Sequence, residues 1–207
     1  MSQALQLAYE HRYANALVPV ARLLEDHIKG CLSGEERIDR IVARAKRVDR
    51  FLDKAIRQID GSPKYNDPLN QIQDQLGARV VTYYLEDVER KSKVIEKYFH
   101  PVERKTIVPD SETEFGYFGK HLILLVPNDV LGDEEQRKLT PRFFELQIKT
   151  LFQHAWGEAE HDLGNKPEVQ LTSQEKRKIA FTSAQAWGAD LIFNELHLRV
   201  LGRTGKE

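Results

Sequence analysis

Two periodicities meet in the stretch FFELQIKTLFQHAWGEAEH, residues 143–161. In its first half, the apolar residues Phe144, Leu146 and Ile148 alternate with polar ones, which is the period of two expected of a strand with one buried face. From Thr150 onward, apolar residues recur at spacings of three and four, which indicates a helix. The stretch therefore predicts a strand that leads directly into a helix.

The polar sides of both predicted elements carry reactive groups. On the strand they are Glu145, Gln147 and Lys149, an acid, an amide and a base on one face. On the helix they are His154, Glu158 and His161. A half-exposed edge strand followed by an amphipathic helix accounts for this pattern as well as a functional site does, so other parts of the chain must decide between them.

The composition narrows the class of protein. The chain has 207 residues, 41% of them hydrophobic, which is enough for one compact core. The charges of its 31 basic and 32 acidic side chains nearly cancel, which argues against a general nucleic-acid or membrane binder. An anionic ligand must therefore bind to a local cluster of cations. The single cysteine, Cys31, excludes an intrachain disulfide and is typical of a reducing compartment, here the cytoplasm. We see no signal peptide and no membrane helix in the sequence pattern.

The N-terminal part of the chain has helical spacing. Residues 3–30 predict a scaffold helix that is interrupted near Pro19 and ends at Gly30. Residues 35–59 carry an apolar stripe at helical period, with basic residues opposite it: Lys46, Arg50, Lys54 and Arg57. The pattern fits one continuous helix, or two helices separated at residues 44–46 with Asp49 capping the second. A charged stripe of this kind is usually a solvated helix face.

Strand and helix signals then alternate, which predicts an α+β fold. Turn-forming residues 61–69 lead to the strand LGARVVTYY, residues 76–84, with Asp74 just before it and Arg79 early within it. Helical spacing returns at residues 86–99, and HLILLVP at residues 121–127 is a short apolar strand. A polar loop at residues 128–141 leads to the stretch quoted first.

The C-terminal part predicts one further helix. It opens at Thr172, where Glu175 three residues later completes a capping box. We expect it to run to about Val200 and to pack on the core through Ile179, Trp187 and Phe193.

An acidic, turn-rich segment, PDSETEFGYF at residues 109–118, precedes the apolar strand. Within it, Tyr117 follows Gly116 and could present a flat ring to a nucleobase. A tyrosine packed against its own loop is the commoner arrangement.

Three motifs together resemble a known family. They are DQLGARVV at residues 74–81, GYFGKH at 116–121, and ELQIKT at 145–150 followed by AWGEAEH at 155–161. Their order and spacing resemble the synthetase domain of RelA/SpoT-type enzymes, particularly the stand-alone small alarmone synthetases, over roughly residues 35–166.

The resemblance implies a fold and a reaction. The fold is a nucleotidyltransferase-like mixed sheet flanked by helices, in a single domain: residues 1–34 would form an N-terminal helical scaffold, 35–166 the catalytic core and 167–207 the C-terminal helix. The reaction is transfer of a pyrophosphoryl group from ATP to the 3′-hydroxyl of GDP or GTP, which makes (p)ppGpp. It needs Mg²⁺ on carboxylates and cations on the triphosphate, and the hard oxygen ligands that Mg²⁺ prefers are present.

The resemblance also assigns residues. It makes Asp74 and Glu145 the catalytic and Mg²⁺-binding acids, and Glu145 could help to deprotonate the acceptor hydroxyl. On the ATP side it places Arg44 and Arg79 on the adenine and three cations on the triphosphate, namely Lys46, Lys54 and Arg57. On the acceptor side it places Tyr117, His121, Gln147 and Lys149. The match favours a break near residues 44–46 over one continuous helix.

Two positions depart from the family pattern. Gly119 stands where the acceptor loop usually has serine, and Lys149 stands where the strand usually has arginine, which keeps the charge but loses the two-pronged hydrogen bonding. The approach to the loop is acidic rather than basic. Its acids, Asp110, Glu112 and Glu114, could bind the N–H edge of guanine and would repel the polyanionic backbone of tRNA.

Other functions stay open from the sequence. The protein could be a toxic relative that pyrophosphorylates an adenine nucleotide or the tRNA 3′ end, although we favour a guanine nucleotide. It could also be a catalytically silent nucleotide-binding module, although both acids are present. His154, Glu158 and His161 could be imagined as a metal trio, but no HExxH pattern accompanies them. His161 and Asp162 alone do not predict a hydrolase. We expect no membrane partner, and a homo-oligomer is compatible with the sequence.

Overall fold

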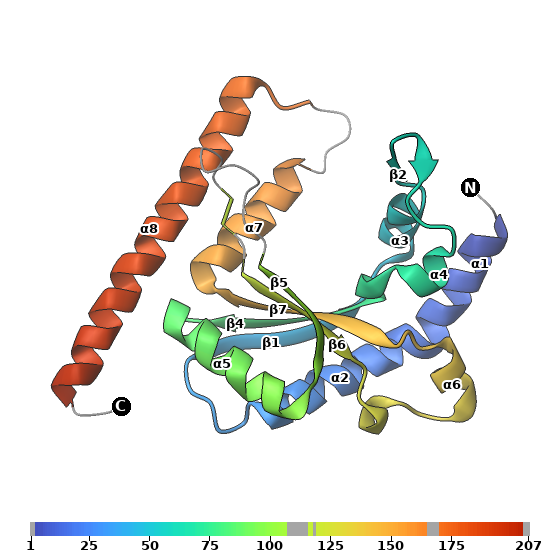
Figure 1. Ribbon diagram of the computed structural model, residues 1–207, viewed down its shortest axis with the longest axis horizontal. Coiled ribbons are helices and arrows are strands. Elements are labelled where there is room, and N and C mark those ends of the chain that lie inside the picture. The colour runs from blue at the N-terminus through green and yellow to red at the C-terminus, as the bar shows by residue number, and fades with distance from the viewer. Residues whose placement is uncertain (1–2, 107–115, 118, 165–169, 205–207) are drawn as a thin grey trace.

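A five-stranded mixed sheet forms the centre of the computed structural model, which describes residues 3–106, 116–117, 119–164 and 170–204 (Figure 1). In spatial order its strands are β1 (Ile38–Ala45), β4 (Leu76–Thr82), β7 (Phe143–Thr150), β6 (Lys120–Leu125) and β5 (Pro101–Thr106). The central strand β7 runs parallel to its neighbour β4, and every other neighbouring pair is antiparallel. This arrangement confirms the predicted α+β fold with a mixed sheet.

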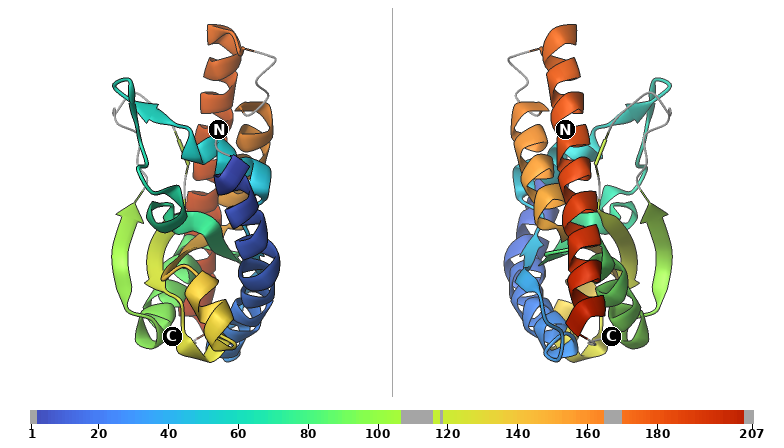
Figure 2. Two further views of the ribbon diagram at one scale, coloured as in Figure 1. Left: turned by 90° about the vertical axis from the view of Figure 1, so that its right-hand side faces the viewer. Right: turned by 90° about the vertical axis from the view of Figure 1, so that its left-hand side faces the viewer.

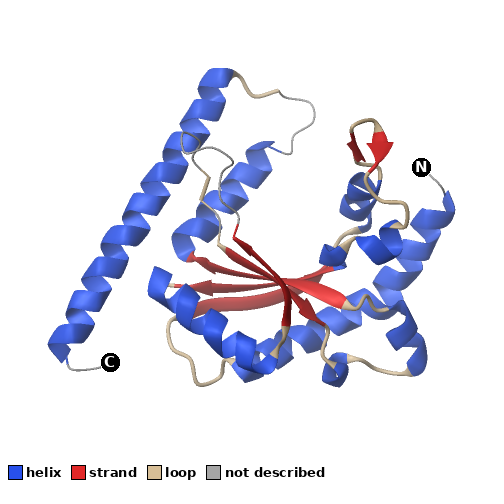
Figure 3. Cartoon of the chain, viewed as in Figure 1, coloured by secondary structure: helices blue, strands red, loops and turns tan. Residues whose placement is uncertain are grey.

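Helices cover both faces of the sheet (Figure 3). One face packs on α2 (Val18–Cys31) and α5 (Leu85–Tyr98), and the core lies between them. Its fully buried side chains include Leu24 of α2, Ile95 of α5 and the three apolar residues of β7, Phe144, Leu146 and Ile148. The alternation along β7 is confirmed, because its other side chains point to the opposite face, where α7 (Leu151–Gly164) packs on β4 and β7.

The N-terminal helix is interrupted where the sequence predicts it. The helix α1 (Gln3–Arg12) leads into a π-helical turn at Tyr13–Leu17, and Pro19 lies in the first turn of α2. Proline is tolerated there because the first N–H groups of a helix have no partner within it. The helix ends at Cys31, so Gly30 is its penultimate residue rather than its stop.

The prediction of a helix at residues 38–45 is wrong, because this segment is the edge strand β1. Its apolar residues have helical spacing, but several are β-branched, and the strand pairs with β4 from Ile38 opposite Thr82 to Ala45 opposite Leu76. Pairing with a strand distant in sequence is invisible to local periodicity. The break near residues 44–46 is confirmed, since α3 (Val48–Ala55) is a separate helix; Asp49 lies in its first turn and does not cap it.

Several short elements were not predicted. They are β5, the hairpin of β2 (Gln58–Ile59) and β3 (Ser62–Pro63), α4 (Pro68–Gln71), the 3₁₀ turns at Gln73–Gln75 and Asn128–Val130, and α6 (Glu134–Leu139). The strand β5 is as long as β6, but it has the charged sequence of an edge strand. The other elements are too short for periodicity to reveal.

The last helix, α8 (Ser173–Thr204), lies alongside α7 and also contacts α5 (Figure 2). The capping box is confirmed, because Thr172 and Glu175 exchange side-chain and backbone hydrogen bonds. The predicted packing is only partly correct: Phe193 stacks on Phe152 of α7, but Trp187 and Phe193 are 44% and 50% exposed. Nowhere in the described chain is a helix both long and apolar enough to cross a membrane.

A buried ionic cluster ties the start of β1 to α5. Asp87 and Lys91, 1% and 0% exposed, are linked by a hydrogen bond of 2.9 Å. The guanidinium of Arg37 binds both oxygens of Asp87, and Lys91 also lies 3.3 Å from Glu35. Arg37 has a backbone φ of +59°, a left-handed conformation that is uncommon for a residue other than glycine.

Candidate active site

The sheet face under α7 gathers the predicted site residues from strands far apart in sequence. The register of β4 and β7 places Glu145 opposite Gly77 and Gln147 opposite Arg79. In the next strand, His121 of β6 lies opposite Gln147. Residues directly opposite each other in neighbouring strands share a face, so Arg79, Gln147 and His121 form one row across the sheet.

Asp74 lies in the 3₁₀ turn that immediately precedes β4. Its Oδ2 accepts from the ammonium groups of Lys46, at 2.8 Å, and Lys54, at 2.9 Å. Burial by itself would raise the pKa of Asp74, but these two cations together lower it below its ordinary value. The structure therefore joins a predicted metal-binding acid to two predicted triphosphate-binding lysines.

Glu145 is held from two sides. Its Oε1 lies 2.9 Å from Nδ1 of His121, and because a carboxylate can only accept, the imidazole donates. Its Oε2 accepts from the side-chain amide of Gln147 at 3.3 Å. Burial would raise the pKa of Glu145, and the charge of Asp74 also raises it, but the bond from His121 lowers it overall, so the acid is ionised at neutral pH.

The two acids fit a divalent cation. Oδ1 of Asp74 is buried and has no hydrogen-bond partner among the described residues, whereas Oδ2 is occupied by the two lysines. A buried oxygen without a partner is costly unless something else satisfies it. The described part of the chain contains no cluster of three or more potential metal ligands. A pair of carboxylates suits an ion that completes its shell with phosphate and water oxygens.

The two arginines predicted for adenine lie on neighbouring strands. Arg44 of β1 is opposite Gly77, and Arg79 is opposite Val42, so the arginines are diagonal neighbours on one face. The guanidinium of Arg79 donates to the carboxylate of Glu158 and to Nδ1 of His154, at 3.1 Å, both on α7. Arg57, the remaining predicted cation, is exposed and follows α3.

A comparison with known proteins decides the family. The family model described as "Region found in RelA / SpoT proteins" matches residues 43–181, which span β1 to α8. The chain belongs to the RelA/SpoT family. The match covers both acids, both arginines and the cation cluster around Asp74, so the resemblance seen in the sequence is confirmed.

Individual RelA/SpoT relatives agree with this assignment. GTP pyrophosphokinase YjbM of Bacillus subtilis (strain 168) is 26% identical over 164 residues, which cover 77% of this chain and 72% of the relative. The crystal structure of small alarmone synthetase 1 from Bacillus subtilis has a TM-score of 0.72 at 24% identity, over 88% of this chain and 92% of that one. A GTP pyrophosphokinase family protein from Streptococcus pneumoniae has a TM-score of 0.73 at 18% identity, over 98% and 97%. The last two likenesses establish a shared fold.

In this RelA/SpoT protein, the tyrosine that we predict to stack on the acceptor base is packed into the molecule. Tyr117 is 8% exposed, and its hydroxyl donates to Oδ2 of Asp190 on α8 at 2.7 Å. The hydroxyl of Thr150, at the end of β7, donates to the same oxygen at 2.5 Å. Burial and the hydrogen bond to Asp190 raise the pKa of Tyr117, so its hydroxyl keeps its proton. The ring is not an open stacking face in this conformation, and its role with the acceptor base stays a prediction.

The two departures from the family pattern touch each other. A Cβ at Gly119 would lie 2.4 Å from Cγ of Lys149 and 2.5 Å from the carbonyl oxygen of Ile148. The backbone contact leaves no room for a serine at this place without movement of the strand. Burial, and next the charge of Arg79, lower the pKa of Lys149 to about 8. Glycine here lets the stem of this lysine pass close to the backbone at Gly119.

Sequence reasoning did not single out Asp190, the hydrogen-bond partner of Tyr117. It lies on α8, 73 residues after Tyr117, and nothing in the spacing of α8 distinguishes it from other polar residues. The acids Asp110, Glu112 and Glu114, to which we assign guanine selectivity, lie outside the described residues.

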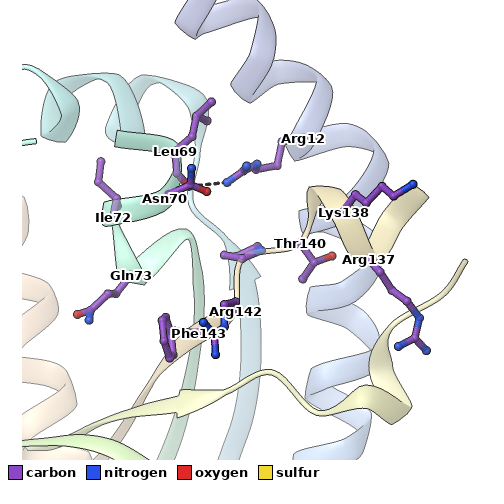
Figure 4. Close-up of a pocket in the computed structure, with 11 residues that line it drawn as sticks. Arg12, Leu69, Asn70, Ile72, Gln73, Arg137, Lys138, Thr140, Arg142 and Phe143 are labelled. Atoms are coloured by element: carbon purple, nitrogen blue, oxygen red, sulfur yellow. Dashed lines mark hydrogen bonds between the residues drawn. The ribbon is translucent and has the colours of Figure 1, made fainter. Parts of the chain in front are cut away.

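A separate pocket lies between α1, α4, α6 and the start of β7 (Figure 4). Its lining includes Arg12, Asn70, Gln73 and Arg142. The guanidinium of Arg12 is committed to structure, because it donates to the carbonyl oxygen of Leu69 at 2.6 Å. None of the predicted site residues lines this pocket, so it is separate from the candidate site on the sheet face.

Proposed function

We propose that this RelA/SpoT protein is a pyrophosphokinase that transfers pyrophosphate from ATP to the 3′-hydroxyl of GDP or GTP, producing (p)ppGpp in the cytoplasm. The observation that carries the proposal is the joint placement of Asp74, with its two lysines, and Glu145 at the parallel strands β4 and β7. The relative YjbM is named a GTP pyrophosphokinase, and small alarmone synthetase 1 has been crystallised with its product pppGpp and with AMPCPP.

The donor base fits between Arg44 and Arg79. Diagonal neighbours in an antiparallel pair are separated by roughly 7–8 Å, which leaves space for one flat ring between two planar guanidinium groups. Stacking of this kind needs the delocalised plane of arginine, which lysine lacks. Adenine is therefore the group that we assign to this gap.

The triphosphate would extend from adenine toward Lys46, Lys54 and Arg57. Phosphoryl-type transfer depends on positioning and on neutralising charge, and these cations supply the charge. In this structure both lysines bind Asp74, at 2.8 and 2.9 Å, so the metal-binding acid and the phosphate-binding cations are already held together.

Asp74 and Glu145 are the residues that would hold Mg²⁺, which when bound supplies Lewis-acid stabilisation of the phosphate oxygens. Glu145 is ionised and oriented by His121, so it can accept the proton of the attacking 3′-hydroxyl. His121 and Gln147 hold the carboxylate from both sides and limit its rotation. Attack by the 3′-oxygen on the β-phosphorus of ATP then releases AMP.

The acceptor would lie over β6 and β7, against His121, Gln147, Lys149 and the loop that carries Tyr117. We favour a guanine nucleotide over tRNA because the acids before Tyr117 can accept from the N–H groups of guanine and would repel a polyanionic strand.

The function is tested by the labelled product. Purified protein is incubated with γ-labelled ATP, Mg²⁺ and one acceptor at a time from GDP, GTP, AMP, ATP and tRNA. We expect label in a guanosine product. Label only at the tRNA 3′ end or in an adenosine product would assign the protein to the toxic relatives, and the absence of labelled product with every acceptor would favour a silent nucleotide-binding module.

The acceptor role of Tyr117 gives a separate prediction. Tyr117→Ala should weaken acceptor binding by about 1 to 3 kcal/mol through loss of base stacking, while ATP binding is unchanged. Tyr117→Phe is the matched control, because it keeps the ring and removes only the hydroxyl that binds Asp190. Acceptor KM measured at saturating ATP should rise for the alanine variant and stay near the wild-type value for phenylalanine. Equal effects of both variants would instead assign the importance of Tyr117 to its bond with Asp190.

A further inference from the structure

The helix α7 holds the guanidinium of Arg79 through two side chains one helical turn apart. Nη1 of Arg79 donates to Oε1 of Glu158 and to Nδ1 of His154, the latter at 3.1 Å. The side chain of Arg79 is 18% exposed, as is that of His154, whereas that of Glu158 is 56% exposed. The contact joins residues 79 positions apart in the chain, so it links β4 to the helix above it.

The hydrogen bonds to Glu158 and His154 do not use the flat faces of Arg79. The N–H groups of a guanidinium lie in its plane, so hydrogen bonds to Glu158 and His154 are made at the edge of the group. A base that stacks uses the face instead. Edge bonding therefore fixes the orientation of the plane without competing with a stacked ring.

The bond also defines the state of His154. Arginine has no acceptor, so Nδ1 of His154 must carry a lone pair, and the imidazole is neutral with its proton on Nε2. Burial, and next the charge of Arg79, lower the pKa of His154, in agreement with this state. The other charged groups that face it are Glu158, Arg40 and Lys149.

His154 and Glu158 are two of the three residues that the sequence pattern places on the polar face of α7, the third being His161. A metal trio of His154, Glu158 and His161 is not formed in the described structure. Hydrogen bonding to Arg79 accounts for an acid and an imidazole four residues apart on this side of α7.

We propose that Glu158 and His154 are positioning residues that fix the plane of the Arg79 guanidinium for stacking on the donor base. The proposal rests on the proposed function, which places ATP on Arg79. It makes α7 part of the donor site, although neither residue touches the reacting atoms.

The sign of the expected effect separates positioning from simple electrostatics. Removing an acid near a polyphosphate reduces repulsion, so Coulomb's law alone predicts that Glu158→Ala strengthens ATP binding. Positioning predicts the opposite, because Arg79 loses its main partner and must be ordered at the moment of binding. Weaker binding after loss of a negative charge therefore cannot come from the charge itself.

The experiment measures the affinity for AMPCPP, whose α,β-bridge blocks transfer, by titration calorimetry in the presence of Mg²⁺. The variants are Arg79→Ala, Arg79→Lys, Glu158→Ala, Glu158→Gln, His154→Leu and the double variant of Arg79→Ala with Glu158→Ala. Glu160→Gln removes one negative charge from the same helix and is the matched control. Steady-state KM for ATP and for the acceptor, and kcat, are measured on the same proteins.

We expect Arg79→Ala to weaken AMPCPP binding about tenfold, on the scale of a desolvated cation–π contact, with little rescue by Arg79→Lys. Glu158→Ala and His154→Leu should each weaken it about threefold to tenfold, and Glu158→Gln less because it keeps an acceptor oxygen. The loss should appear in KM for ATP, with kcat and the acceptor KM near wild type. In the Arg79→Ala background, Glu158→Ala should add nothing, because residues that act through one another are not additive.

Two results would overturn the proposal. Unchanged or tighter AMPCPP binding in Glu158→Ala, with Arg79→Ala still impaired, would show that Glu158 does not position Arg79. Additive losses in the double variant would show that Glu158 acts independently of it. If Arg79→Ala bound AMPCPP with unchanged affinity, the adenine site would lie elsewhere. That result would contradict the proposed donor site, and it differs from the two results above because Arg79→Ala is itself unaffected. Glu160→Gln should leave the affinity within about twofold in all cases.

Discussion

Glu145→Gln should abolish pyrophosphate transfer while the fold stays intact. The substitution keeps the size of the side chain and removes the charge to which we assign both acceptance of the 3′-hydroxyl proton and binding of a divalent cation. Loss of a positioned general base typically costs about 10²- to 10⁴-fold in rate. The partners of Glu145, His121 and Gln147, can still hydrogen-bond to an amide, so thermal stability should change little.

Asp74→Asn should also abolish transfer, but in a way that depends on the metal. Its unpartnered Oδ1 is the oxygen that we assign to the cation, and the charge of Asp74 also holds Lys46 and Lys54. Raising the Mg²⁺ concentration should therefore recover part of the activity of Asp74→Asn and less of that of Glu145→Gln.

Both predictions are checked by measuring the rate of labelled-product formation at a series of Mg²⁺ concentrations. Glu134→Gln, at an exposed position on α6, is the control. Near-normal turnover of either variant would remove that acid from the catalytic site.

The second large effect concerns stability rather than catalysis. Asp87→Ala should destabilise the protein by about 3 to 5 kcal/mol, because it leaves the buried ammonium of Lys91 and the guanidinium of Arg37 without their shared carboxylate. In a chain of this length the change corresponds to a fall of roughly 10 °C in the melting temperature. Thermal and urea unfolding of the variant measure it.

An exposed ion pair gives the control for Asp87→Ala. Glu134 and Lys138 on α6 are 83% and 73% exposed, and an exposed pair of this kind is worth at most about 1 kcal/mol, so Glu134→Ala should unfold near the wild-type midpoint. A similar small change in Asp87→Ala would mean that water or neighbouring groups replace the carboxylate.

The pH dependence of the stability should also differ between the wild-type protein and Asp87→Ala. Burial would raise the pKa of Asp87, but the bonds from Arg37 and Lys91 lower it overall. A carboxylate with a lowered pKa stabilises the fold above its unfolded-state pKa of about 3.9, and this contribution is lost as the pH falls through the folded-state value. Wild-type protein should thus lose more stability than Asp87→Ala when the pH is lowered through this range.

Much of the candidate site could be predicted from sequence because its residues lie in elements with strong local patterns. Alternation along β7 assigned Glu145, Gln147 and Lys149 to one face, and the described structure places them there. The β-branched run after Asp74 identified β4. Which of these residues perform the reaction stays a prediction that the variants above test.

Local pattern misled at residues 38–45, where the apolar spacing is helical but the segment is a strand. Ile38, Ile41, Val42 and Ala45 fit a helix, yet they form the strand β1, because β4 offers backbone partners that a local pattern cannot reveal. The edge position of β1 removes the strict alternation that usually identifies a strand, since even Val42 is 42% exposed.

The sequence by itself determined which segments bury an apolar face and which acids and bases are available to the reaction, because periodicity and side-chain chemistry are properties of neighbouring residues. Only the tertiary structure decided which of these groups meet. Arg79 hydrogen-bonds to Glu158 and His154 on α7, Tyr117 hydrogen-bonds to Asp190 on α8, and Gly119 lies close to Lys149. The residues in each of these pairs are separated by 30 or more positions in the chain. Such contacts depend on strand register and on how helices cross the sheet, which are set by the packing of the whole core rather than by any one stretch.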